Sequence, residues 1–199
     1  MSYRIYQIIL WICRSFSRRH VYMIADCVGY LTYLLAPRGP AACRKNIRII
    51  KGPDADYRTV NRLAIATYRN FSRFIGDFFS LPQTDQDDLA KDVVVTNAGI
   101  LEREYAKGKG VIIVSAHMGN WEVGGTVIAN MGYPLYAVAL SHKSPKTNEL
   151  FLRLRKEKNI RVIDLKNTKS TLYDRLRQGN INALIGDQIY TSEKGVTVN

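Results

Sequence analysis

The pattern of apolar and polar positions divides the chain into a helical first part and an alternating second part. Between residues 57 and 79, apolar and aromatic residues recur close to the helical period, which predicts a long helix. A shorter helix is expected over residues 41–50, where basic and apolar residues are interspersed. Two apolar stretches, residues 5–13 and 21–36, open the chain, and the basic cluster Arg18-Arg19-His20 separates them. We expect both stretches to be helical.

The second part alternates short β-branched runs with longer amphipathic segments. Strands are expected at residues 111–115, 135–140, 161–165 and 181–185, and helices at residues 124–131, 148–158 and 171–178. Before them the sequence predicts a short strand at residues 93–96 and a helix at residues 100–106. Strands that alternate with helices of this length predict an α/β fold, with a mostly parallel sheet flanked by helices.

The positive charge of the chain is concentrated at its apolar N-terminus. The net charge is +12, from 29 basic and 17 acidic residues, and residues 1–51 hold nine Lys or Arg against one acid, Asp26. Neither N-terminal apolar stretch reaches the ~20 residues that a membrane-spanning helix needs. Basic flanks favour two interfacial or hairpin helices at the anionic inner leaflet, and a pair of buried core helices is the alternative. We therefore expect membrane-anchoring helices over residues 1–40 and an α/β core over residues 41–199.

The composition argues against several other classes of protein. The three cysteines, Cys13, Cys27 and Cys43, are odd in number and form no CxxC pair, so neither a disulfide framework nor a zinc site is expected. Reduced thiols facing the cytosol are the default. Nucleic acid is the rival partner for a basic chain. Here, however, the aromatic residues lie among long aliphatic runs, so no nucleic-acid binding is expected.

A histidine follows the first strand of the alternating part. The apolar run at residues 111–115 leads to His117, and Glu122 comes five positions later. On a continuous helix this spacing would leave the two side chains on different faces. Gly119 and Asn120 are residue types that permit a bend, and a bend would bring the pair together. A histidine beside a carboxylate can take a proton from an alcohol near neutral pH.

Further polar residues follow the other predicted strands. In an open α/β sheet, ligands bind at the carboxyl ends of the strands, and here those ends carry His117, Ser141-His142 and Asp187-Gln188. No nucleophile on the protein is evident, because Ser115 is expected to point to the opposite side of its strand. A substrate hydroxyl is the simpler nucleophile, without a covalent enzyme intermediate.

Three segments match motifs of a known enzyme superfamily. His117-Met-Gly-Asn-Trp-Glu122 resembles the HxxxxE/D motif of the lysophospholipid acyltransferase superfamily, in the form seen in its lipid A late acyltransferase (lauroyl/myristoyl transferase) branch. Ile185-Gly-Asp-Gln188, followed by residues 194–198, is similar to that branch's Asp-Gln or Asp-His segment before a Gly-x-x-Val strand. Arg44-Lys-Asn-Ile47 is a looser match to an Arg-x-Asn-Leu segment. The order and spacing fit, so the resemblance covers nearly the whole chain.

The resemblance implies a role for each matching residue. His117 would deprotonate an acceptor hydroxyl, Glu122 would orient and polarise the histidine, and the hydroxyl would attack the thioester of an acyl carrier protein or coenzyme A. The residues implied on the substrate side are Asn120, Arg155, Asp187 and Gln188, with no metal and no cofactor beyond the acyl donor. For Arg155, and for its neighbour Arg153, a solvated helix face is the alternative.

The resemblance also implies a reaction and a location. We expect a membrane-associated O-acyltransferase at the cytoplasmic face of the bacterial inner membrane, adding a fatty acyl group to a lipid A precursor or related glycolipid. The alternatives are a lysophospholipid or phosphatidylinositol mannoside acyltransferase and a non-catalytic membrane-binding module. Members of the family normally continue beyond the position of Asn199, so the core is expected to be truncated at its C-terminus.

Overall fold

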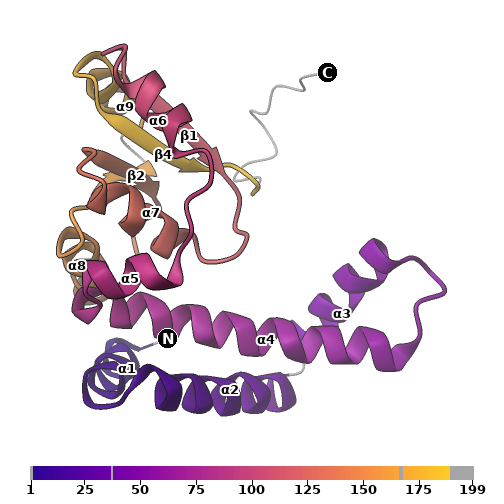
Figure 1. The fold of residues 1–199 in the computed structure, drawn as a ribbon. Coiled ribbons are helices and arrows are strands. Elements are labelled where there is room, and N and C mark those ends of the chain that lie inside the picture. Colours follow the sequence, from indigo (N-terminus) through magenta and orange to yellow (C-terminus); the bar gives the residue numbers. More distant parts are fainter. Residues whose placement is uncertain (1, 37, 166–167, 189–199) are drawn as a thin grey trace. The chain divides into compact units, whose positions relative to one another are not determined.

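The chain divides into two compact units, Met1–Ser80 and Leu81–Asn199 (Figure 1). A computed structural model describes residues 2–36, 38–165 and 168–188.

The first unit is helical throughout its described residues. Its helices are α1 (Tyr3–Ser15), α2 (Arg18–Leu35), α3 (Arg38–Lys51) and α4 (Tyr57–Ser80). Each of them agrees with a helix that the sequence predicts, to within a few residues at either end. Helices α2 and α4 lie side by side (Figure 1), and α4 also contacts α1 and α3. The first compact unit continues to Ser80, and the division into membrane-anchoring helices over residues 1–40 and a core over residues 41–199 stays a prediction.

A glycine allows α2 and α4 to approach closely. A Cβ atom at Gly29 would lie 2.8 Å from the Cα of Arg69 and 2.8 Å from the carbonyl oxygen of Tyr68, and both of these are backbone atoms of α4. A side chain at this position would force the helices apart, so the packing depends on glycine. Val60 and Ala64 of α4 are fully buried.

Polar contacts also join α2 to α4. Asp26 accepts hydrogen bonds of 2.6 Å from both Arg69 and Arg73, and Tyr22 donates one of 2.7 Å to Asp77. The Arg73 guanidinium, assisted by Arg69, lowers the pKa of the Asp26 carboxyl from 3.8 to about 2. The one acid within the second apolar stretch is therefore held as an anion by two arginines of α4.

Several large apolar side chains of α1 and α2 remain exposed. Among them are Ile8, Trp11, Met23 and Leu31, each more than half exposed. Within the described segments, no helix is both long enough and apolar enough to cross a membrane.

The second unit is an α/β structure. Its helices are η1 (Leu81–Gln83, a 3-10 turn), α5 (Gln86–Asp92), α6 (Ala98–Tyr105), α7 (Trp121–Asn130), α8 (Pro145–Lys156) and α9 (Thr168–Arg177). Its strands are β1 (Val111–Ser115), β2 (Leu135–Ala139), β3 (Arg161–Asp164) and β4 (Ile181–Ile185). They form a parallel sheet in the order β1-β4-β2-β3. The predicted α/β fold with a parallel sheet is therefore confirmed.

The core of the second unit lies around strands β4 and β2. Ile181 is fully buried, Leu135 is almost so, and both cluster with Ala129 and Ile160. Burial of an aliphatic side chain of this size contributes about 1.5–3 kcal/mol. These contacts fix the strands, and the strands in turn fix the polar segments that follow them.

The predicted strand at residues 93–96 is wrong. Val93 ends α5, because its N–H donates to the carbonyl oxygen of Leu89 at 3.0 Å, and Val94 is 87% exposed. Asn97 then adopts a left-handed φ of 59° before α6 begins. Consecutive valines favour a strand locally, but strand preference reflects packing on a half-buried surface, which this segment lacks. The strand expected over residues 194–198 lies outside the described residues.

Candidate active site

The carboxyl ends of β1 and β4 lie side by side. The two strands pair with Ser115 opposite Ile185, and the N–H of Gly186 donates to the carbonyl oxygen of Ser115 at 2.9 Å. The residues that follow the strands therefore start from neighbouring positions at one edge of the sheet. His117 follows β1 and Asp187 follows β4.

His117 and Asp187 form a pair with two hydrogen bonds. The ring Nδ1 of His117 lies 2.7 Å from Oδ1 of Asp187, and the backbone N–H of His117 donates to Oδ2 at 3.0 Å. One carboxylate thus holds both the ring and the backbone of the loop that carries it. The side chains are 34% and 37% exposed, which leaves the pair accessible to a substrate.

The protonation of this pair follows from its geometry. The hydrogen bond from the His117 side chain is the largest cause of a lowered pKa for Asp187, and the bond from the His117 backbone adds to it. An ionised Asp187 can only accept hydrogen bonds, so Nδ1 carries the hydrogen and Nε2 is the proton acceptor of the neutral ring. His117 therefore has the arrangement of a general base whose carboxylate partner stabilises the imidazolium that forms.

The loop between β1 and α7 contains the predicted bend. Gly119 has a φ of 64°, in the left-handed region that glycine adopts without strain. Asn120 is the N-cap of α7, because its side chain accepts a hydrogen bond of 3.2 Å from the N–H of Val123. This cap starts the helix at Trp121, earlier than the predicted residue 124. The ring of Trp121 meets that of His117 edge-on, with 4.7 Å between the ring centroids.

Glu122 forms a second, buried ion pair. Its side chain is 10% exposed and that of its partner, Arg155 of α8, is 16% exposed. Arg155 donates from its terminal nitrogen to Oε1 at 2.6 Å and from Nε to Oε2 at 3.2 Å. Bidentate pairs of this kind are strong, and a position in the first turn of α7 also favours the negative charge. The pair joins α7 to α8.

The structure therefore differs from the pairing that the sequence predicts. The partner of the His117 ring is Asp187, whereas the sequence predicts Glu122. The bend does not bring Glu122 to Nδ1, because the first turn of α7 directs its carboxylate to Arg155.

The remaining implied residues occupy distinct surroundings. Arg155 is largely buried and does not lie on a solvated face, unlike Arg153, which is 56% exposed and lies 3.8 Å from Glu157. Gln188 is exposed next to Asp187, and its role stays a prediction. Asn120 caps α7, and its contact with a substrate also stays a prediction.

A further polar group follows β2 and β3. Ser141 donates a hydrogen bond to the carboxylate of Asp164, the last residue of β3. The ring of His142 packs 4.3 Å from that of Phe151 on α8. Burial, together with the positive charge of Arg155, lowers the pKa of His142 and favours the neutral imidazole.

Two residues of this edge are not singled out by the sequence. Asp164 could have been identified from the sequence, because a charged residue at the carboxyl end of an apolar strand indicates a polar site there. Phe151 gave no signal, because its position in the helical pattern of α8 is that of any apolar residue. Its ring contacts two side chains of the site region, with the Arg155 guanidinium 6.0 Å and the centroid of the His142 ring 4.3 Å from its own centroid.

Comparison with protein families gives a match over almost the whole chain. The model of the family described as bacterial lipid A biosynthesis acyltransferase matches residues 2–199.

Among curated proteins, a phosphatidylinositol mannoside acyltransferase of Mycolicibacterium smegmatis is 26% identical over 128 residues, covering 64% of this chain and 41% of the relative. The protein of the same name from Mycobacterium tuberculosis is 25% identical over 166 residues, covering 80% of this chain and 52% of the relative. The chain spans about half the length of these relatives, or less.

Proposed function

Because the chain belongs to the bacterial lipid A biosynthesis acyltransferase family, we propose that it carries the catalytic part of an O-acyltransferase. The proposed reaction moves a fatty acyl group from a thioester to a hydroxyl of a membrane glycolipid. The observation that carries the proposal is the hydrogen bond between Nδ1 of His117 and Asp187, which leaves Nε2 as a base at an accessible edge of the sheet.

In the proposed mechanism His117 acts first as a base and then as an acid. Nε2 takes the proton of the acceptor hydroxyl while the oxygen of that hydroxyl attacks the thioester carbonyl. A C–O bond forms, the C–S bond breaks, and the leaving thiolate takes the proton back from the imidazolium. Asp187 holds the ring in the required tautomer and stabilises its positive charge. The protein itself forms no covalent intermediate.

Glu122 and Arg155 have a positioning role in this proposal. Their bidentate pair ties the start of α7 to α8, and the loop that presents His117 ends at the N-cap of α7. A fixed helix start keeps the base oriented toward the acceptor. The proposal thus keeps both residues in the machinery, with Asp187 rather than Glu122 on the histidine ring.

The acceptor class rests on the comparisons. The description of the matching family names lipid A biosynthesis, and the names of the curated relatives refer to phosphatidylinositol mannosides. Both names refer to glycolipids, so a sugar hydroxyl is the proposed nucleophile. A lipid A precursor or related glycolipid is the leading acceptor, a phosphatidylinositol mannoside is the second, and acyl carrier protein or coenzyme A is the proposed carrier of the acyl group.

Location at the cytoplasmic face of the inner membrane is also proposed. Exposed apolar side chains on α1, such as Ile8 and Trp11, are followed in the sequence by Arg14 and the Arg18-Arg19 pair. Short amphipathic helices with basic flanks suit an anionic membrane surface. The positive net charge also suits an acidic acyl carrier protein and the phosphates of lipids.

The test is the variant His117→Ala, assayed with a labelled acyl thioester and each glycolipid acceptor. We expect kcat to fall by roughly 10²–10⁴-fold, the usual contribution of a positioned general base. His20→Ala, which removes an exposed histidine of the first unit, is the matched control and should retain activity. Transfer by His117→Ala at the wild-type rate would overturn the assignment of His117 as the base, whereas no transfer by the wild type would favour the non-catalytic membrane-binding module. The acceptor that is acylated by the wild type decides between the two glycolipids.

A further inference from the structure

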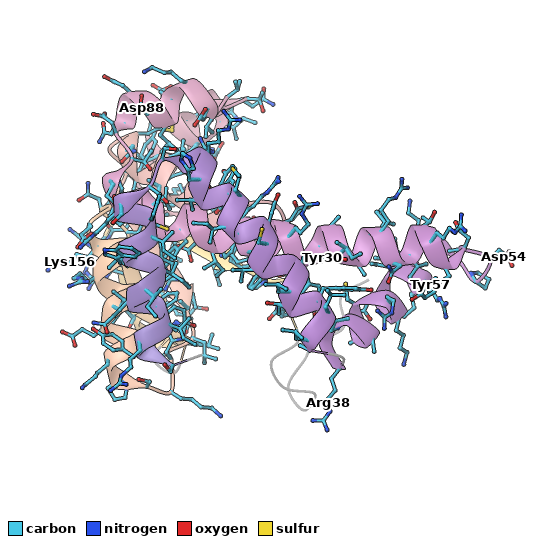
Figure 2. All side chains as sticks on the ribbon, turned by 90° about the horizontal axis from the view of Figure 1, so that it is seen from below. Tyr30, Arg38, Asp54, Tyr57, Asp88 and Lys156 are labelled. Carbon is cyan, nitrogen blue, oxygen red and sulfur yellow. The ribbon has the colours of Figure 1, made fainter. Side chains whose placement is uncertain are left out.

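A groove lined by basic residues lies on α3, apart from the candidate active site. It has a volume of about 500 Å³ and is lined by Arg44, Lys45 and Arg48 together with Ile49, Gly52 and Pro53. Helix α3 contains five basic residues and no acidic residue, and the nearest acids in the sequence, Asp54 and Asp56, lie in the turn that follows it. The turn that closes the groove leads into α4, and Figure 2 shows Asp54 and Tyr57 at this tip of the unit.

Arg44, one of the two arginines that line the groove, is held in place by contacts with α2. Arg44 donates a hydrogen bond of 2.6 Å to the hydroxyl of Tyr33, and that hydroxyl donates to Asn61. The guanidinium also stands 5.7 Å from the centroid of the Tyr33 ring, and Tyr33 is itself buried. This chain of contacts joins α3 to α2 and α4. The guanidinium at the base of the groove therefore has little freedom to lose when an anion binds.

The other two cations of the groove are available for a ligand. Lys45 and Arg48 are exposed, and neither forms an ion pair with any described residue. Three cations around one groove match the chemistry of a phosphate, which accepts several charge-assisted hydrogen bonds.

The apolar neighbours of the groove indicate where that phosphate comes from. Ile49 and Ile50 follow Arg48 directly and are 74% and 81% exposed. Exposed isoleucines beside cations fit a lipid surface, where the head groups and the acyl chains lie next to each other. An acidic protein surface could pair with the cations, but it would not account for two consecutive exposed isoleucines.

We propose that the α3 groove binds the phosphate of an anionic membrane lipid, with Arg44, Lys45 and Arg48 around the phosphate and Ile49 and Ile50 against the lipid surface. The inference rests on the proposed membrane attachment of the first unit and assigns part of it to a defined site. It does not depend on His117.

The test is binding of the purified chain to phosphatidylcholine vesicles with and without phosphatidylglycerol. The double variant Lys45→Gln/Arg48→Gln should bind the anionic vesicles roughly 30-fold more weakly than the wild type, because each basic residue at an anionic surface contributes about a fivefold gain. The matched control is Arg58→Gln/Arg62→Gln, which removes two exposed charges from α4 of the same unit and should change binding little. Circular dichroism establishes that both variants are folded.

Each of the other possible outcomes of the binding experiment would overturn a different part of the proposal. Equal losses in the two double variants would mean diffuse attraction and no α3 site. Binding of inorganic phosphate alone, without vesicle binding, would assign the groove to a free anion. Binding to an acidic protein but not to vesicles would assign it to a protein partner. If the wild type binds no vesicle at all, the proposed membrane attachment itself fails, whereas the outcome for His117→Ala in acyl transfer is independent of this experiment.

Discussion

At the scale of single residues, the chemistry depends on which carboxylate reaches Nδ1 of His117. Asp187 does so at 2.7 Å, and its second oxygen also accepts the backbone N–H of the histidine. Glu122, the acid nearest in the sequence, is bound to Arg155. The two carboxylates therefore make different predictions when each is replaced by its amide.

Asp187→Asn should lower kcat by roughly 10²–10⁴-fold with little change in KM for the acceptor. The amide can donate to Nδ1 and so favours the wrong tautomer, which places the hydrogen on Nε2. Steady-state kinetics measure the effect, and Glu149→Gln, on the exposed surface of α8, is the control.

The pH dependence gives a second readout of the same pair. Because the pKa of Asp187 is lowered, its carboxylate stays ionised as the pH falls to the ordinary aspartate value of 3.8 and somewhat below. A wild-type loss of activity at mildly acidic pH therefore belongs to another group. A loss of activity that follows the titration of Asp187 above pH 3.8 would contradict the geometry.

At the scale of elements, ion pairs tie helices together in both units. Glu122–Arg155 joins α7 to α8, and Asp26 with Arg69 and Arg73 joins α2 to α4. The first pair is nearly buried, while the arginines of the second are 45% and 41% exposed. Breaking the nearly buried Glu122–Arg155 pair should therefore lower the free energy of unfolding more than breaking the partly exposed pairs of Asp26.

Glu122→Gln should lower the free energy of unfolding by about 3 kcal/mol, because it leaves the Arg155 charge buried without its partner. In Glu122→Gln/Arg155→Gln the loss should be smaller than the sum of the two single losses. Thermal or urea unfolding measures these values, and Arg153→Gln on the exposed face of α8 should change stability by less than about 0.5 kcal/mol. Additive losses would show that the pair does not interact.

Asp26→Asn should destabilise the first unit by about 1–2 kcal/mol at neutral pH, a value reduced for the exposure of its arginines. The folded pKa of Asp26, about 2, lies below the ordinary value of 3.8. The stabilisation is therefore fully present above pH 3.8 and is lost as the pH falls through about 2. Urea unfolding over a pH series should show the wild type and the variant converging in this range, while exposed Asp54→Asn stays near the wild type throughout. A difference that does not vary with pH would contradict this account.

Local pattern predicted most of the elements of both units. Strands β1 and β4 were predicted with the bounds that the structure gives, because a short apolar run between turn residues favours a strand over a longer helix. The strand predicted at residues 93–96 does not form, because these residues do not pack on a half-buried surface that would support their local strand preference. The bend at Gly119 was predicted from residue type, but the partner of His117 was not. That partner depends on the register between two strands whose sequences lie 70 residues apart, and a local pattern carries no information about such pairing.

In the molecule as a whole, the proposed base and the proposed membrane-binding surfaces belong to different units. His117 lies at the edge of the sheet in the second unit, whereas the exposed apolar side chains of α1 and α2 and the basic groove of α3 belong to the first. This division allows catalysis and lipid binding to be altered separately, as the two sets of variants require. Because the chain covers about half of each relative or less, acceptor specificity is a property to measure on the protein itself.

In the proposed reaction, His117 acts as the base of acyl transfer and Asp187 acts through it. The most direct measurement compares kcat for the wild type, His117→Ala, Asp187→Asn and His117→Ala/Asp187→Asn with the same thioester and glycolipid. We expect the double variant to be no slower than His117→Ala, because the effects of residues that act as a unit are not additive. Losses that multiply in the double variant, or a His117→Ala enzyme with wild-type kcat, would contradict the proposed reaction.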